Sequence, residues 1–448
     1  MDDLLRETAR RAGNYLNTLG SRPVFPSSAA ISRLSKLGGS LPDAPSAPQD
    51  VLELLDEIGS DATVASAGGR YFGFVVGGVL PAALAANWLA AVWDQNGMSS
   101  VSSPVAAKIE EIVIPWLLDL LHLPEECAGA LVTGAMMANF TALAAARHSV
   151  LRKSGWDVEA DGLAGSPPVT VMVSEQAHPT LLKAASLLGF GHRTLVPIPV
   201  DEQGRMISDA LPSIAGPTII CAQAGNVSTG AFDPIGEICQ RVKATEAWVH
   251  VDGAFGLWAA AAPKRRHLTA GVAEADSWAT DAHKWLNVPY DSGMVFVRDR
   301  SSLETAMTPP VAYLPEADCR EPWKYTPEAS RRARGIEIWA ALRCLGRSGI
   351  ADLIERSCRH ATRFANGLRE AGHSVLNDVV LNQVLVSFGS DDKNLRVLKA
   401  VQEDGTCWCS SALWCGRKVM RISVSSWATT DGDVERSLSA ILRLATNG

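Results

Sequence analysis

Residues 247–254, Ala-Trp-Val-His-Val-Asp-Gly-Ala, decide the fold class of this chain. The first five residues form a short apolar run, which stops at Asp252 beside small residues. Upstream, similar short runs alternate with helical patterns, which is typical of an α/β protein with a mostly parallel sheet and helices on both faces. The expected strands are 169–173, 193–197, 218–222 and 247–251, and the expected helices between them are 179–188, 206–214 and 234–243.

The pattern continues in both directions along the chain. Two more strands are expected at 275–280 and 293–297, on either side of the segment Asp281-Ala282-His283-Lys284-Trp285. Long helical patterns over 330–345 and 349–370 precede a mixture of short strands and helices, which indicates a smaller α+β domain. We therefore expect an N-terminal helical arm over 1–75, a large domain over 76–304, and a lid-like loop with the small domain over 305–448.

The composition is that of an average soluble globular protein. Of its 448 residues 47% are hydrophobic and 20% are charged, and the formal net charge is −7. Such a chain can bury a large core, and it contains no run of Lys and Arg that would suit a phosphate backbone. Nucleic acid is therefore not expected as a partner.

The nine cysteines favour free thiols in a reducing compartment. Their number is odd, and most lie inside apolar or helical stretches rather than in evenly spaced loops. The C-x-C-x5-C spacing of Cys407, Cys409 and Cys415 matches no common zinc pattern, and no His lies nearby. No metal is expected, and the cytoplasm is the expected location.

Two uncharged stretches, Tyr71–Trp93 and Cys127–Ala146, are long enough to cross a membrane. The first contains Gly, Pro and Asn, and the second is rich in Ala and Gly and lacks flanking basic loops. The N-terminus has neither an apolar core nor a cleavage site of a signal peptide. Both stretches are therefore expected in the buried core, and no membrane is expected.

The chemistry is expected around Asp252 and Lys284. Ligands of open parallel sheets bind beyond the carboxyl ends of the strands, where Asp252 lies. Lys284 follows in an otherwise apolar context, directly after His283. An arbitrary Asp and Lys would more often form a surface ion pair, so the surrounding motifs have to decide between the two interpretations.

The surrounding motifs are the segments 70–74 (RYFGF), 174–178 (SEQAH), 230–235 (GAFDPI), 249–254 (VHVDGA), 280–285 (TDAHKW) and 330–334 (SRRAR). Together they resemble the group II pyridoxal-phosphate decarboxylases, which include the aromatic amino-acid and glutamate decarboxylases. The resemblance implies a pyridoxal-phosphate-dependent transferase fold of type I, like that of aspartate aminotransferase. It also implies a homodimer with active sites at the subunit interface, which would explain the N-terminal arm.

The resemblance assigns roles at the ring of pyridoxal 5'-phosphate. Lys284 corresponds to the lysine that forms the Schiff base, since an amine is nucleophilic once it is neutral. Asp252 corresponds to the partner of the pyridine nitrogen, where a carboxylate keeps the nitrogen protonated and the ring a strong electron sink. His178 matches the histidine that lies flat on the ring, and Ala254 matches the small residue on the opposite face.

The segment 132–139, Val-Thr-Gly-Ala-Met-Met-Ala-Asn, corresponds to the phosphate cup of the family. A Gly turn before a helix offers free backbone N–H groups to an anion. Many members have a hydroxyl where this chain has Ala and Met, and Asp281 replaces a commoner Asn. The remaining residues assigned to the cofactor are Thr133, Gly134, Ala135, Met136, Asn226, Ser277 and His283.

The expected reaction is loss of the α-carboxylate of an L-amino acid as carbon dioxide, with Tyr313 of the lid-like loop as the acid that protonates the carbanion. The alternatives are an aminotransferase, an aldehyde synthase or oxidase, or a carbon–carbon lyase on the same site, and a non-enzymatic subunit that binds the cofactor for structure. The aromatic side chains of Tyr71, Phe72, Trp88 and Trp93 favour an apolar or aromatic substrate. Arg70 offers a partner for a distal carboxylate.

Overall fold

The computed structural model describes residues 1–308 and 320–447, which form two compact units. The larger unit comprises residues 79–362 and 377–384, and the other comprises residues 1–78, 363–376 and 385–448. The three segments expected from the sequence remain a prediction. The compact units cut across them, because residues 1–78 fall in the same unit as residues 385–448.

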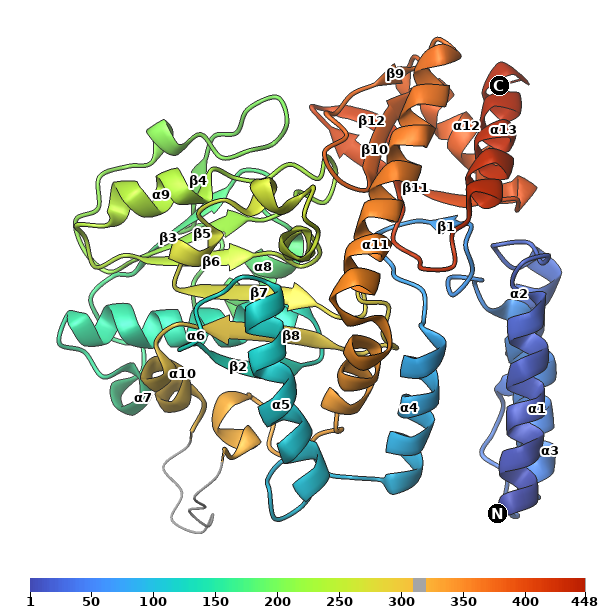
Figure 1. Ribbon diagram of the computed structural model, residues 1–448, viewed down its shortest axis with the longest axis horizontal. Helices are drawn as coiled ribbons and strands as arrows, with labels where there is room; N and C mark the ends of the chain where they lie inside the picture. Colours follow the sequence, from blue (N-terminus) through green and yellow to red (C-terminus); the bar gives the residue numbers. More distant parts are fainter. Residues whose placement is uncertain (309–319, 448) are drawn as a thin grey trace. The chain divides into compact units, whose positions relative to one another are not determined.

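The larger unit is built on a seven-stranded sheet with helices on both faces (Figure 1). Four neighbouring pairs, from β4 through β3, β5 and β6 to β7, are parallel, while β8 runs antiparallel to both β7 and β2. This confirms the mostly parallel α/β sheet. In spatial order the strands are β2 (Ala128–Val132), β8 (Gly293–Val297), β7 (Ser277–Asp281), β6 (Trp248–Asp252), β5 (Thr218–Gln223), β3 (Thr170–Ser174) and β4 (Val196–Ile198).

Helix α6 (Ala135–Lys153) is the central buried helix of this unit. It packs against β6, β7 and β8, and most of its residues are buried, as the sequence predicts for this stretch. Its first turn comes very close to the sheet, since a Cβ added at Gly293 would lie 2.4 Å from the Cα of Gly134. Glycine at position 293 therefore lets the N-terminus of α6 approach the start of β8.

Among the described residues of the larger unit, seven more α-helices lie wholly or partly within it. The two long helical patterns near its end are confirmed as one helix, α11, that breaks at Gly346, whose φ is +58°. The helices are α4 (Pro81–Trp93), α5 (Pro104–Leu120), α7 (Val158–Asp161), α8 (Pro179–Leu187), α9 (Ile235–Val242), α10 (Arg300–Met307) and α11 (Gly335–Glu370).

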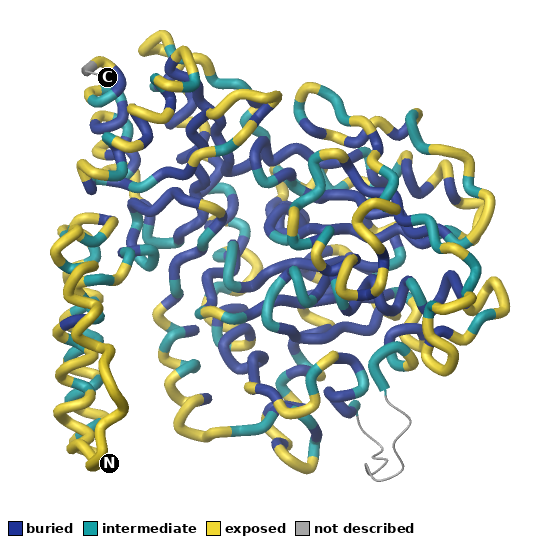
Figure 2. Tube along the Cα trace, turned by 180° about the vertical axis from the view of Figure 1, so that it is seen from behind, coloured by how far each residue is buried: buried dark blue, intermediate teal, exposed yellow. Residues whose placement is uncertain are grey.

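The other unit combines helices with most of a five-stranded sheet, as the α+β pattern predicts. Its sheet has the order β1 (Tyr71–Phe72), β11 (Trp408–Trp414), β12 (Arg417–Ser423), β10 (Gln383–Ser387) and β9 (Ser374–Val375). Helix α12 (Asp391–Asp404) packs on β11 and β12, and on α13 (Asp431–Asn447). The N-terminal residues form α1 (Asp2–Thr18), α2 (Ser28–Arg33) and α3 (Pro48–Gly59), and no residue of α1 is buried (Figure 2).

Two expectations about local structure are wrong. Residues 206–214 contain only a 3-10 turn (Ser208–Ala210), because Pro212 disfavours helix at the residue before it. The stretch 71–93 is only partly core, since four apolar side chains of α4 are exposed: Trp88, Leu89, Val92 and Trp93. Among the described residues, no helix is both long and apolar enough to cross a membrane.

Candidate active site

The carboxyl ends of β5, β6 and β7 open onto one cavity of about 250 Å³. Because the three strands are parallel and in register, Gln223 lies next to Asp252, and Asp281 ends the following strand. This is the edge at which ligands of parallel sheets bind. The cavity is lined by Gly134, Ala135, Met136, His178, Thr180, Gln223, Gly225, Val227, Asp252, Ala254, Phe255, Asp281, His283 and Lys284.

Asp252 is a buried carboxylate held from behind by a chain of hydrogen bonds. The Nδ2 of Asn139, on α6, donates to Oδ2 of Asp252 at 3.1 Å, and the Oδ1 of Asn139 lies 2.9 Å from Nε2 of His250. The other ring nitrogen of His250 lies 2.9 Å from Oγ of Ser277. Alternate residues of a strand share a face, so His250 and Asp252 both point toward α6.

The direction of every bond in this chain follows from its last member. The ionised carboxylate of Asp252 only accepts, so the Asn139 amide donates to it and Oδ1 of Asn139 accepts from Nε2–H of His250. In a neutral ring Nδ1 of His250 is then an acceptor, and it accepts the hydroxyl proton of Ser277, whose Oγ in turn accepts the indole N–H of Trp248 at 2.8 Å. Burial lowers the pKa of His250 to about 3, which agrees with a neutral ring.

Opposing effects act on the charge of Asp252. Burial raises the pKa of this carboxyl group, while the charges of Lys284 and His178 and the hydrogen bonds from Asn139 and the Ala254 amide lower it. The network thus favours the ionised form in a place where burial alone would favour the neutral acid. A buried carboxylate of this kind can hold a proton on a basic nitrogen placed opposite it.

Lys284 brings a primary amine to the same cavity. It follows β7 closely, and its Nζ lies 3.1 Å from Oδ2 of Asp281, with about a fifth of its side chain exposed. The backbone there is anchored by Trp258, whose indole donates to the carbonyl of Asp281 at 2.9 Å. Lys284 and Asp252 are therefore brought together by the structure, as the motifs predict.

His178 and Ala254 also line the cavity. His178 is the N-cap of α8, and its Nδ1 accepts from the Thr180 amide at 3.3 Å and lies 2.7 Å from the Thr180 hydroxyl. With Nδ1 an acceptor for the amide, the proton of a neutral ring sits on Nε2. The imidazole is thus fixed by the start of its own helix, in the wall of the cavity that Lys284 and Asp252 also line.

The expected phosphate cup lies at the N-terminus of α6. Gly134, Ala135 and Met136 line the cavity together with His283, as expected. Nδ1 of His283 accepts from the Ser292 amide at 3.1 Å, and burial lowers the pKa of its ring. Thr133, in contrast, is half-buried and is not one of the lining residues.

Two other predicted cofactor residues lie elsewhere. Ser277 does not line the cavity, because it begins β7 and is fully buried against His250, about four residues or roughly 13 Å from the strand end at the cavity. Asn226 is also buried, and its Oδ1 accepts from the amides of Ser228 and Thr229. Only its neighbours line the cavity. Tyr313 lies outside the described residues.

The residues proposed for substrate selection do not line the cavity either. Arg70 is buried, with its guanidinium donating to the backbone carbonyls of Gly20, Arg22 and Thr406, so it is not free to bind a distal carboxylate. Tyr71 stacks on Trp408 with ring centres 5.1 Å apart. The expectation that Arg70 is available to substrate is therefore wrong.

Sequence reasoning missed Gln223. The side chain lines the cavity and is 95% buried, yet its Nε2 has no hydrogen-bond partner among the described residues. A buried donor without a partner is costly, which points to a group that fills the cavity. The signal was present in the sequence, since Gln223 directly follows the apolar run 218–222 just as Asp252 follows its own.

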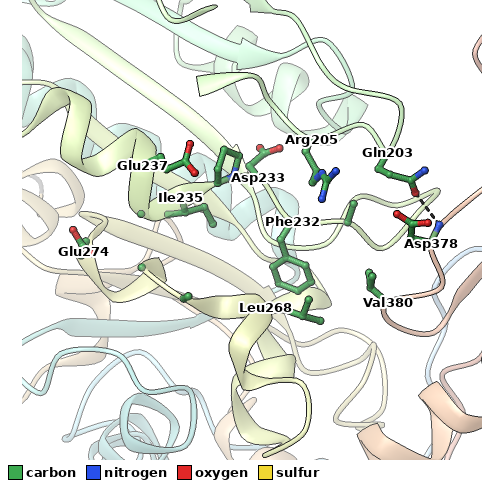
Figure 3. A pocket seen from close by; sticks show the side chains of 15 residues that line it. Gln203, Arg205, Phe232, Asp233, Ile235, Glu237, Leu268, Glu274, Asp378 and Val380 are labelled. Atoms are coloured by element: carbon green, nitrogen blue, oxygen red, sulfur yellow. Dashed lines mark hydrogen bonds between the residues drawn. The ribbon is translucent and has the colours of Figure 1, made fainter. Parts of the chain in front are cut away.

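A larger cavity, of about 450 Å³, lies elsewhere in the same unit (Figure 3). It is lined by apolar residues such as Phe232 and Leu268 and by acidic ones such as Glu237 and Asp378. The amide of Asp378 donates to Gln203 at 2.8 Å at its rim. None of the predicted site residues lines it, so size alone does not identify the site.

Comparison with known proteins agrees with the geometry. The model of the pyridoxal-dependent decarboxylase conserved domain matches residues 42–389. Tryptophan decarboxylase 1 of Oryza sativa subsp. japonica is 27% identical over 97% of this chain and 91% of that protein. L-2,4-diaminobutyrate decarboxylase of Rhizobium meliloti (strain 1021) is 30% identical over 80% of this chain and 74% of that protein.

A solved structure shares the fold along the whole chain. The tryptophan decarboxylase of Oryza sativa, crystallised with pyridoxal phosphate and tryptamine, superposes with a TM-score of 0.91. The alignment covers 100% of this chain and 97% of that one at 23% sequence identity. The fold is therefore that of a type I pyridoxal-phosphate enzyme.

Proposed function

This chain belongs to the pyridoxal-dependent decarboxylase family, and from that premise we propose that it decarboxylates an aromatic L-amino acid to the corresponding amine. It is a pyridoxal-phosphate-dependent carboxy-lyase. The observation that carries the assignment to this cavity is the meeting of Lys284 with Asp252, whose carboxylate is buried and held by Asn139. The aromatic substrate is the part that goes beyond family membership.

The donor set of the cavity fits the cofactor at three points. A primary amine, Lys284, suits the aldehyde carbon, and a buried carboxylate, Asp252, suits the pyridine nitrogen. The amide of Gln223 supplies an unused donor in the wall. At the remaining end, the first amides of α6 suit an anion.

When bound, pyridoxal phosphate supplies the electron sink that accepts the charge left behind as carbon dioxide departs. The protein supplies position and electrostatics. Lys284 would anchor the group through its amine, Asp252 would keep a proton on the ring nitrogen, and His178 and Ala254 would bound the space for the ring. Orientation of the substrate at its α-carbon decides which bond breaks. Tyr313 is our candidate for the acid that returns a proton.

Three observations support an aromatic substrate over an acidic one. Tryptophan decarboxylase 1 of rice matches this chain nearly from end to end. Arg70, which could have paired with a distal carboxylate, is fully engaged by backbone carbonyls. The cavity wall also includes apolar side chains, among them Met136, Val227 and Phe255, which suit an apolar body.

The test is to incubate the purified protein, loaded with pyridoxal phosphate, with each of the aromatic amino acids, with glutamate and with 2,4-diaminobutyrate. Carbon dioxide release is followed, and products are identified by mass spectrometry. We expect an aromatic amine in equimolar amount to carbon dioxide, and no product from Lys284→Ala. An amine derived only from glutamate or diaminobutyrate would refute the aromatic assignment. A keto acid or an aldehyde would refute the decarboxylase assignment in favour of a transferase or an aldehyde synthase.

We also propose a homodimer with active sites at the interface. Helix α4 exposes four large apolar side chains in a row of about one and a half turns, with Val92 63% and Leu89 52% exposed. Clustered apolar exposure of this kind marks an interaction surface. A second copy of this chain is the partner that the family resemblance implies.

The cytoplasm is the location that we propose. The eight cysteines among the described residues are all free thiols, and two of them, Cys344 and Cys415, are exposed. Free exposed thiols are usual in a reducing compartment. Electrophoresis of the protein from cells lysed with a thiol-blocking reagent tests this, and native disulfides would contradict it.

A further inference from the structure

A carboxylate occupies the end of the cavity that suits an anion. Oδ1 of Asp281 accepts the amide N–H of Ala135, the first residue of α6, at 2.6 Å, and the side chain is 3% exposed. The same carboxylate lies 3.1 Å from the ammonium of Lys284 and 3.5 Å from Nε2 of His283. Asp281 thus takes the place at the helix N-terminus that a bound phosphate would otherwise use.

The neighbouring side chains do not compensate for this negative charge. Ala135 and Met136 carry no hydroxyl group that could donate to phosphate. Burial lowers the pKa of His283, so its ring is neutral near pH 7 and brings no positive charge. Lys284 balances Asp281 only while its ammonium stays at this carboxylate, and the reaction needs that amine at the aldehyde instead.

We propose that the buried carboxylate of Asp281 repels the phosphate group of the cofactor and thereby lowers the affinity of this site for pyridoxal phosphate. The inference rests on the assignment of the cofactor to this cavity. Like charges a few ångströms apart in a partly buried site repel strongly, and the repulsion acts only on the phosphorylated form. The cofactor is consequently an exchangeable one, and the apoenzyme is readily formed.

The substitution Asp281→Asn tests the effect of the negative charge alone, because it removes the charge and keeps the size of the side chain. Asparagine keeps an oxygen that can accept the Ala135 amide, and it replaces the second oxygen by a donor that suits phosphate. We expect the dissociation constant for pyridoxal phosphate to fall at least about tenfold. Pyridoxal, which lacks the phosphate, should change by less than about threefold.

The measurement is a titration of apoenzyme with pyridoxal phosphate and with pyridoxal, followed by absorbance and by quenching of tryptophan fluorescence. Glu126→Gln is the matched control, because it changes the net charge equally at an exposed ion pair with Arg298. Asp281→Ala serves as a second variant, and it should shift the preference between the two ligands in the same direction. Thermal melting of the apo forms verifies folding.

The outcomes separate this proposal from the cofactor assignment. Unchanged or weaker binding of pyridoxal phosphate by Asp281→Asn, with wild type binding normally, overturns the proposal alone. Equal tightening of both ligands overturns it too, because the effect would then act through Lys284 and not through the phosphate. If the wild-type protein binds neither ligand, or if Lys284→Ala shows the same absorbance change on binding as wild type, then the assignment of the cofactor to this cavity is refuted.

Discussion

Replacing Asn139 by leucine tests the hydrogen-bond chain that supports Asp252. Asn139 is the only link between His250 and the carboxylate in that chain, with one bond on each side at 2.9 and 3.1 Å. Both Asn139 and His250 are completely buried, and Asp252 is 6% exposed. Water cannot reach these buried groups without a rearrangement of the protein. The lost hydrogen bonds are therefore not replaced, and their full free-energy cost lowers the stability.

The magnitude follows from the two broken bonds. A hydrogen bond to a charged group contributes about 1.5–3 kcal/mol, and a buried N–H left without an acceptor costs about 1–3 kcal/mol. Burial of the leucine side chain offsets roughly 1 kcal/mol of that sum. We therefore expect the free energy of unfolding to fall by about 1.5–5 kcal/mol. The pKa of Asp252 should also rise, because the bond from Asn139 is one of the effects that lower it.

Urea unfolding of the apoenzyme measures the first effect. Thr141→Val is the matched control, since Thr141 lies buried in the same helix and bonds only to the carbonyl of Met137. The second effect is read from the ¹⁵N shift of the pyridine nitrogen in labelled pyridoxal phosphate, which should lose its proton at lower pH in Asn139→Leu. A loss of stability no larger than that of Thr141→Val, with an unchanged nitrogen signal, would refute the reasoning.

Three further predictions concern other parts of the molecule. Glu110→Ala leaves the guanidinium of Arg331, which is 1% exposed, without its counter-ion. The free energy of unfolding, measured in urea, should decrease by about 3–5 kcal/mol. The control Lys108→Ala removes an exposed ion pair of the same helix and should cost less than about 1 kcal/mol. His250 takes up a proton below pH 6.5 in the unfolded chain but only near pH 3 in the folded protein. The free energy of unfolding should therefore decrease by about 1.4 kcal/mol for each pH unit by which the pH is lowered within that window. His250→Gln should show a shallower slope, and an equal slope would contradict the buried neutral ring. Val92→Asp should yield a monomer in light scattering while Leu187→Asp, equally exposed on α8, leaves the dimer, and a monomeric wild type rules out the proposed interface.

The sheet and the ring end of the site could be predicted because their signals are local. Each strand of a parallel sheet is an apolar run, and its functional residue is the first polar one after it, as with Asp252. Asp281 follows the next strand in the same way, and His283 and Lys284 come directly after it. The motifs and the strand ends therefore coincide in sequence, and no long-range information is needed to find them.

The hydrogen-bond chain and the role of Ser277 could not be predicted in this way. Asn139 and His250 are 111 positions apart, and each alone resembles an ordinary polar residue in a buried element. The contacts of Ser277 depend on how its strand pairs with the neighbouring strand, and the predicted bounds 275–280 do not give that pairing. The exposure of α4 was missed for a related reason, since an apolar helix is buried by its own chain or by a partner with the same sequence pattern.

The two ends of the cofactor site differ in how they are built. Behind Asp252, every donor meets an acceptor, from the indole of Trp248 to the carboxylate, and the arrangement needs no adjustment when a pyridine nitrogen arrives. At the N-terminus of α6, the amide of Ala135 is already used by Asp281, so binding of a phosphate has to displace a charge of its own sign. Lys284 would have to leave Asp281 to bond to the cofactor, so this carboxylate would lose its counter-charge as the phosphate arrives. We therefore expect substitutions behind Asp252 to alter mainly the ring end of the site, and substitution of Asp281 to alter mainly the affinity for pyridoxal phosphate.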